Sequence, residues 1–236
     1  DIKKLSESIV FDPIKLTDEI CEKIKGPLQR ANQIMVIEKN GSFTYSILKE
    51  IGFEKANKLT LIILEPLSEE IIHYIFGENE KLPEIKFIKD INEIENMPKF
   101  DIVIGNPPFQ DSSKIAKNYN LWTKFIPLGF NSVKENGFLG LVSPDSWLAP
   151  AETQNIEVRD VLFKNNLLFL DTSSKKHFPK IGSNFCYFLV QKNKDYKDTE
   201  IILEDGKKTN IDFNKIRFLP GIMDSYSISI VNKVLN

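Results

Sequence analysis

The sequence predicts an α/β fold in which helices cover both faces of a mostly parallel sheet. Apolar, strand-like runs alternate with helical patterns from Asn32 onward, and connections of this length are the right-handed crossovers that join parallel strands. Several of the runs are apolar on both faces, as the buried strands of a parallel sheet are. With 236 residues, 42% of them hydrophobic, the chain can bury one sizeable core as one large domain or a domain with an appendage.

The first half of the chain contains two strand and helix pairs followed by two more strands. The β-branched run 33–38 and the longer apolar run 58–66 are each followed by a helical pattern that closes on a glycine, a common C-terminal stop. The elements predicted here are strands at 33–38, 58–66, 85–90 and 100–106, with helices at 43–52 and 67–77.

The second half continues the alternation and then changes character. Helical patterns cover 121–137 and 155–166, and strands are predicted at 138–144, 167–173 and 185–192. The stretch 199–213 indicates an antiparallel hairpin with its turn at "EDGKK". We expect this hairpin to begin an appendage rather than to continue the parallel sheet.

Composition excludes few classes of protein. The net charge of -2, from 31 basic and 33 acidic residues, neither favours nor excludes a nucleic-acid partner, because a local basic stripe can bind phosphate on a neutral protein. Cys21 and Cys186 lie far apart without metal-ligand neighbours, which favours two reduced, buried thiols over a disulfide. We find no membrane helix and no signal peptide, and expect a cytoplasmic protein, prokaryotic or phage-encoded. The start at Asp1 and the end in a helical stretch suggest a fragment of a longer chain.

Polar or unusual residues follow four of the predicted strands, where ligands of open α/β sheets bind. They are the segment Glu38–Ser42, Glu65, Asp90 and the segment Asn106–Phe109. A carboxylate at the end of the second strand can accept both hydroxyls of a ribose, which makes Glu65 a candidate, although a Glu before Pro also commonly starts a helix. Asp90 could accept a hydrogen bond from an adenine amino group or equally act as an N-cap or turn residue.

The segment "NPPF" at 106–109 is the most specific of these. Proline cannot donate to a sheet ladder, so the two prolines end the strand and stiffen the backbone. The Asn106 side-chain oxygen and the Pro107 carbonyl can then both point at one planar amino group. Phe109 supplies a flat apolar face on which a ring can stack.

This segment resembles the catalytic motif of amino-group methyltransferases that use S-adenosylmethionine, chiefly those that act on adenine in DNA. "FDPIKLTDEICEKI" is similar to the family's leading cofactor motif, in which Asp12 replaces the usual Thr, and "LILEPLSEEI" and "FIKD" resemble its ribose-binding and adenine-contacting motifs. "NGFLGLVSPDSWL" resembles the strand after the catalytic helix, and "HFPKIGSNFCYFLVQK" the later strand pair that shapes the target-base pocket. The match runs from about Ile9 to Lys192, in the gamma order of motifs.

The resemblance implies a Rossmann-like methyltransferase fold with a seven-stranded sheet and a short C-terminal β appendage. It also implies direct methyl transfer from S-adenosylmethionine to the 6-amino group of a flipped adenine in double-stranded DNA, in a restriction-modification or phage-defence system, without a metal. The site residues that it implies are Asn106, Pro107, Pro108 and Phe109 for catalysis, and Phe11, Pro13, Glu38, Gly41, Glu65, Asp90 and Asn106 for the cofactor.

The first cofactor motif departs from the family's pattern. The family has a glycine-rich turn there, whereas this chain reads "IEKNGSFTYSIL" with Gly41 as the single glycine of the turn. Glu38 takes the acidic position. This departure leaves open an altered or partner-dependent cofactor site.

Three alternatives stay open at this point. Related "NPP" enzymes act on a guanine amino group in RNA or on protein glutamine, and cytosine is a less favoured substrate because its enzymes more often carry Ser in place of Asn. A non-catalytic nucleic-acid-binding subunit is the third. We assign 1–198 to the catalytic domain and 199–236 to the start of an appendage or target-recognition region, which is too short to read a DNA sequence without a further C-terminal domain or a partner subunit.

Overall fold

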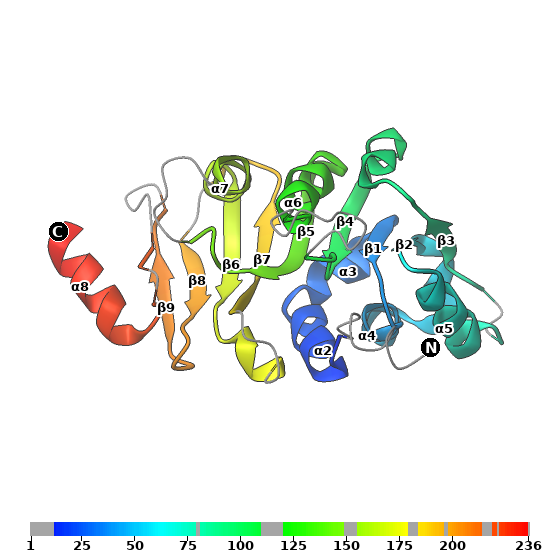
Figure 1. The fold of residues 1–236 in the computed structure, drawn as a ribbon, viewed down its shortest axis with the longest axis horizontal. Helices are drawn as coiled ribbons and strands as arrows, with labels where there is room; N and C mark the ends of the chain where they lie inside the picture. The colour runs from blue at the N-terminus through cyan, green and yellow to red at the C-terminus, as the bar shows by residue number, and fades with distance from the viewer. Residues whose placement is uncertain are drawn as a thin grey trace. The chain divides into compact units, whose positions relative to one another are not determined.

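The computed structural model describes residues 12–78, 81–109, 120–148, 155–178, 184–195, 198–213, 219–220 and 222–235 (Figure 1). The chain divides into two compact units, Asp1–Lys89 and Asp90–Asn236. Phe11, which we expected to contact the cofactor, lies outside the described residues.

The first unit contains three parallel strands in the order β3-β2-β1. These are β1 (Ile34–Ile37), β2 (Leu59–Ile63) and β3 (Glu84–Phe87), with the helices α2 (Ile14–Lys23), α3 (Lys25–Arg30), α4 (Ser42–Ile51) and α5 (Pro66–Phe76) and the 3-10 helix η1 (Phe53–Lys58). All residues of β1 and β2 are buried, as continuous apolar runs require. Helix α5 packs on β2 and β3, and α2 packs against α4.

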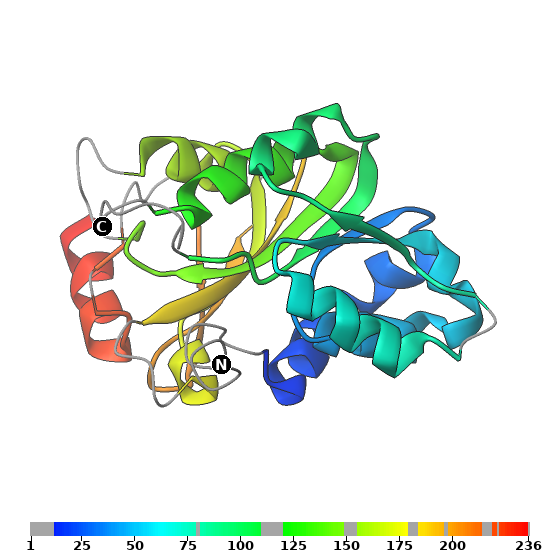
Figure 2. The ribbon, with the colours of Figure 1, turned by 45° about the vertical axis from the view of Figure 1, so that its right-hand side comes forward.

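The second unit contains six strands in the order β4-β5-β7-β6-β8-β9. They are β4 (Phe100–Gly105), β5 (Val133–Pro144), β6 (Asn166–Asp171), β7 (Phe185–Gln191), β8 (Thr199–Ile202) and β9 (Lys208–Ile211). The helices are α6 (Trp122–Asn131), α7 (Ile156–Phe163) and α8 (Ser225–Leu235), with the 3-10 helices η2 (Ile91–Asn96) and η3 (Ser174–His177). Helices α6 and α7 lie side by side, α6 on β5 and α7 on β6 (Figures 1 and 2).

The structure confirms the α/β class and corrects the expected number of strands. Strands β1 to β7 account for the seven that we expected, and the hairpin of β8 and β9 brings the number to nine. The hairpin itself is confirmed as antiparallel, but β8 pairs in parallel with β6 and so extends the sheet of the second unit. The proposed boundary at residue 198 stays a prediction.

The boundary between α6 and β5 also differs from the expectation. The helix predicted over 121–137 ends at Asn131, where the backbone N–H and the hydroxyl of Ser132 both donate to the Leu128 carbonyl at 3.0 Å. The polar residues after it belong to β5, which pairs with β4 from Val133 onward and changes register between Phe100 and Ile102. Polar residues at a bulged strand start read like the end of a helix in the sequence.

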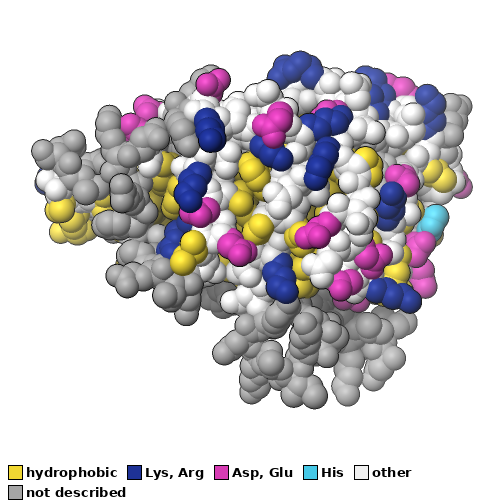
Figure 3. Space-filling model, turned by 90° about the horizontal axis from the view of Figure 1, so that it is seen from above, with side chains coloured by type: hydrophobic (Ala, Val, Ile, Leu, Met, Phe, Trp, Pro, Cys, Tyr) yellow, Lys and Arg dark blue, Asp and Glu magenta, His cyan; other side chains and the backbone are white. Residues whose placement is uncertain are grey.

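Charged side chains of both signs are mixed on the face seen in Figure 3, where Lys and Arg side chains alternate with Asp and Glu among the described residues. This agrees with the nearly balanced composition. Within the described ranges, no helix combines the length and hydrophobicity that crossing a membrane requires.

Candidate functional site

The carboxylate of Glu38 forms the centre of the turn that follows β1. It is buried, with 1% of its surface exposed. Its Oε1 accepts hydrogen bonds from the backbone N–H groups of Lys39 (2.9 Å), Asn40 (3.2 Å) and Gly41 (3.0 Å). Its Oε2 accepts from the Thr44 backbone N–H (2.8 Å) and hydroxyl (2.7 Å). Glu38 therefore builds the turn and the start of α4 by its own side chain.

Gly41 meets two requirements of this turn that other residues meet poorly. Its φ of +80° lies in the left-handed region, which costs an L-residue with a Cβ about 1–2 kcal/mol. A Cβ would also lie 3.1 Å from Ile75 Cδ1 and 3.2 Å from Phe76 Cε2 of α5. The single glycine of the turn is thus the one that its backbone and packing demand.

Two polar side chains of the turn hold the backbone just before α2. The Ser42 hydroxyl and the Asn40 side-chain N–H both donate to the Asp12 carbonyl, at 2.9 and 3.2 Å, and Asn40 also donates to Ser42 Oγ at 2.9 Å. Pro13 comes directly before α2 and is partly exposed. The two predicted cofactor motifs of the first unit are therefore joined, although 28 residues separate Asp12 from Asn40.

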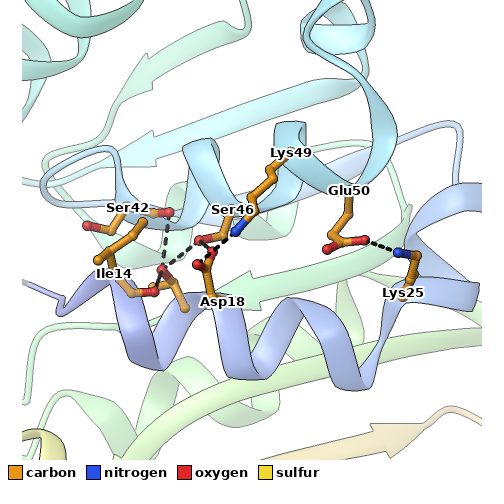
Figure 4. Close-up of polar contacts among 8 residues, drawn as sticks. Ile14, Asp18, Lys25, Ser42, Ser46, Lys49 and Glu50 are labelled. Carbon is orange, nitrogen blue, oxygen red and sulfur yellow. Dashed lines mark hydrogen bonds and ion pairs between the residues drawn. The ribbon is translucent and has the colours of Figure 1, made fainter.

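Helices α2 and α4 are linked further along by a polar network (Figure 4). The buried hydroxyls of Thr17 and Ser46 lie 2.8 Å apart, and Ser46 donates to Asp18 Oδ1 at 2.7 Å. Lys49 pairs with Asp18 Oδ2 at 3.0 Å. A separate ion pair, Lys25 with Glu50 at 2.8 Å, joins the start of α3 to α4.

Acidic groups surround the one lysine of the turn. Burial lowers the pKa of Lys39, while the carboxylates of Asp12 and Glu38 act in the opposite direction. Asp12 is 2% exposed and stands where the related motif usually has a neutral Thr. The turn thus holds two buried carboxyl groups close to one cation.

Glu65 and Asp90 follow β2 and β3 and are exposed. Glu65 occupies the N-cap position of α5, with Pro66 as the first helical residue. Asp90 caps η2: its Oδ1 accepts from the Asn92 backbone N–H at 2.9 Å, and Glu93 Oε1 accepts from the Asp90 backbone N–H at 2.9 Å. Both side chains therefore have the helix-starting places that we left open as alternatives, and their contacts with a cofactor stay predictions.

In the second unit, Asn106 follows β4 directly and is fully buried, at 0% exposure. Gly105 has a φ of +151°, a conformation that residues with a Cβ rarely adopt. This glycine turns the chain out of the strand between the β-branched core and the asparagine. Pro107 is buried and Pro108 partly exposed, so the carbonyl of Pro107 belongs to a backbone with little freedom.

Phe109 is the first member of an aromatic cluster within the second unit. Its ring centroid lies 4.9 Å from that of Phe185, at an interplanar angle of 31°. Phe185 in turn contacts Phe178, with centroids 5.2 Å apart. Phe178 and Phe185 are buried, at 4% and 2% exposure. The structure thus brings the later strand segment to the "NPPF" segment, as the resemblance implied.

The sequence analysis missed Asp145 and Asn184, which form a hydrogen-bonded pair. Asp145 comes directly after β5 and Asn184 directly before β7. Burial and the negative charge of Glu204 raise the pKa of Asp145, while the hydrogen bond from Asn184 and the charge of Lys175 lower it. Asp145 ends a strand like the residues that we selected, so the same rule applied to β5 would have found it.

The cysteines and metal-binding potential complete the description. Cys21 and Cys186 are free and buried, which confirms the prediction of two reduced thiols. Burial raises the pKa of both thiols, that of Cys186 to about 12. In the described part of the chain, no group of three or more His, Cys, Asp or Glu residues is arranged to hold a metal ion.

Solved structures show the fold. The chain resembles a modification subunit of a putative type I restriction enzyme from Vibrio vulnificus, with 12% identity, a TM-score of 0.67, and 96% of this chain and 52% of that one covered. It resembles the type I restriction enzyme EcoKI M protein with 17% identity, a TM-score of 0.63, and 81% and 47% covered. A putative class I S-adenosylmethionine-dependent methyltransferase from Listeria monocytogenes gives 13% identity, a TM-score of 0.61, and 99% and 74% covered. The Rossmann-like methyltransferase fold is confirmed.

Sequence comparisons show the family. A curated relative, an uncharacterized adenine-specific methylase from Mycoplasma pneumoniae, is 30% identical over 151 residues, which cover 57% of this chain. The matched part spans 34% of that relative's length. The model of the Eco57I restriction-modification methylase family matches residues 28–178, a segment that contains the Glu38 turn, "NPPF" and Asp145. The chain therefore belongs to the Eco57I restriction-modification methylase family.

Proposed function

We propose that the full-length protein transfers a methyl group from S-adenosylmethionine to the 6-amino group of adenine in double-stranded DNA. We further propose that it does so in a restriction-modification system and in the cytoplasm, where DNA is accessible. The observation that carries the proposal is Asn106, which is fully buried behind Gly105 and followed by two prolines. Membership of the Eco57I family supports the reaction and the substrate.

The residues of the first unit fit a cofactor with a net positive charge. Two buried carboxyl groups, Asp12 and Glu38, lie in or beside the turn after β1. Glu65 is exposed at the end of β2, so its oxygens are accessible to the hydroxyls of a ribose. Asp90, exposed after β3, can accept from an amino group. When bound, S-adenosylmethionine would supply an electrophilic methyl group on its sulfonium.

The residues of the second unit would prepare the amino group. The exocyclic nitrogen of adenine is a poor nucleophile because its lone pair is delocalised into the ring. The Asn106 side-chain oxygen and the Pro107 carbonyl would accept its two hydrogens, and so favour the tetrahedral form in which the lone pair is available. Pro107 and Pro108 restrict the backbone, and the Phe109 ring would support the base once it has left the duplex.

The proposal is tested with the full-length protein and tritium-labelled S-adenosylmethionine. Duplex DNA, RNA and protein are offered separately, and the DNA product is digested and analysed by mass spectrometry. We expect label in DNA as N6-methyladenine. Label in RNA or protein, or methylated cytosine in the DNA, would replace the proposed substrate by another.

A non-catalytic nucleic-acid-binding subunit is the second candidate, because the turn after β1 has one glycine where the related motif has several. Calorimetry with S-adenosylmethionine distinguishes the two. We expect a dissociation constant in the micromolar range that is usual for enzymes and their ligands. Binding that is millimolar or weaker would favour the subunit.

A further inference from the structure

The end of β5 and the start of β7 place two polar side chains beside the aromatic cluster. The antiparallel pairing of these strands ends at Pro144 opposite Phe185. Asp145 and Asn184 are the next residues on each strand, and their side chains are hydrogen-bonded to each other. The pair therefore lies next to the Phe185 ring, which contacts Phe109 at 4.9 Å.

The same edge of the sheet carries Asn106. Strand β4 pairs in parallel with β5, with Gly105 opposite Leu141, so the carboxyl ends of both strands point the same way. Asn106 and Asp145 follow those ends directly or within a few residues. Amide, aromatic rings and the Asp145–Asn184 pair all belong to the second unit.

The surroundings of Asp145 do not favour a charge. Burial and Glu204, which follows β8, raise the pKa of Asp145, and only Asn184 and Lys175 of η3 act against that shift. A carboxyl group in such a place costs folding stability when it ionises. Groups that are retained at such a cost often serve a site rather than the fold.

We propose that Asn184 donates a hydrogen bond to a ring nitrogen of the extruded base, and that Asp145 is the positioning residue that orients the Asn184 amide. This inference rests on the proposed function and deepens it. The amide carries two N–H donors: one is directed to Asp145, and the other is directed to the base that lies on Phe109 and Phe185. The pair would thereby distinguish a purine with a ring acceptor from a base that lacks it.

The test uses the full-length protein and four DNA substrates. These contain adenine, 1-deazaadenine, 3-deazaadenine or 7-deazaadenine at the target position, each of which keeps the amino group. We expect one deaza substrate to be methylated with a kcat/KM about tenfold below that of adenine, the size of one lost hydrogen bond. Asn184→Ala should lower kcat/KM for adenine about tenfold and leave that one deaza substrate no worse than in the wild type.

Variants of Asp145 test the positioning role. Asp145→Ala should reproduce the pattern of Asn184→Ala across the four substrates, whereas Asp145→Asn should keep most of the discrimination because its amide oxygen still accepts from Asn184. Asn210→Ala, an exposed asparagine on β9, is the matched control and should behave as the wild type. Binding of DNA with 2-aminopurine at the target position, followed by fluorescence, reports base extrusion apart from transfer.

The outcomes separate this inference from the proposed function. If the wild type methylates adenine but Asn184→Ala lowers the rate equally on all four substrates, or on none, the inference is overturned and the function stands. If the wild type transfers no methyl group to adenine, both are overturned.

Discussion

Glu38 and Asn106 are both buried polar residues, but their surroundings give them different tasks. Glu38 accepts five hydrogen bonds from the turn and α4, so it organises the backbone on which a cofactor would lie. Asn106 ends a strand with a side chain that a restricted backbone holds in place. One residue supports the site, and the other is positioned to act on a substrate.

Glu38→Gln should lower the free energy of unfolding by about 2–4 kcal/mol, because an amide NH2 would face N–H donors that now bind a carboxylate oxygen. Urea unfolding at neutral pH measures the change. Glu65→Gln is the control, since Glu65 is exposed and should change stability by less than about 0.5 kcal/mol. Equal stability of the two variants would show that the turn does not depend on the Glu38 carboxylate.

Asp145→Asn should become more stable relative to the wild type as the pH rises. The pKa of Asp145 is raised above its ordinary value of 3.8, so the folded wild type favours the protonated form. Its contribution to stability is present below that value and is lost as the pH rises through the higher folded pKa. Urea unfolding at pH 4.5 and 7.5 tests the sign: a variant whose relative stability falls between these values would contradict it.

At the scale of elements, the polar network between α2 and α4 fixes the segment that precedes α2. Ser46→Ala would leave the buried Thr17 hydroxyl and Asp18 with one hydrogen bond fewer, and should destabilise the protein by about 1–3 kcal/mol. Lys49→Ala removes the exposed ion pair with the same aspartate and should change stability much less. Thermal unfolding of the two variants makes the comparison; a larger effect of Lys49→Ala would contradict the description.

Elements were predictable from the sequence where local pattern decides them, and contacts were not. Apolar runs with helices between them located every strand from β1 to β7. The antiparallel direction of β7 was not predicted, yet it alone brings Asn184 to the same edge as Asp145. The contact of Asn40 with the Asp12 carbonyl likewise joins residues 28 positions apart, and no periodicity encodes it. Strand ends indicated where to look, and the pairing of strands decided which side chains meet.

At the scale of the whole molecule, each unit contains one buried cysteine. Cys21 lies in the first unit and Cys186 in the second, and burial raises the pKa of both thiols. Neither should react with a disulfide reagent at pH 8 in the folded protein, because the thiolate is the reactive form. In increasing urea, each thiol reports the unfolding of its own unit, and mass spectrometry of the labelled peptides separates them. Fast labelling of either thiol without denaturant would contradict its burial.

The family match covers residues 28–178, and the segment from β8 onward lies beyond it. The matched part spans about a third of the curated relative. The account therefore assigns the methyl transfer to residues of the matched segment, and leaves recognition of the DNA sequence to a further domain or a partner subunit, as proposed above.

The most direct test of the central claim is methyl transfer by Asn106→Ala in the full-length protein. N6-methyladenine formed in duplex DNA is measured by mass spectrometry, beside calorimetry of S-adenosylmethionine binding and thermal unfolding. The wild type should form the product, and Asn106→Ala should form it at least about a hundredfold more slowly while remaining folded. Formation of N6-methyladenine by the variant at the wild-type rate would contradict the claim.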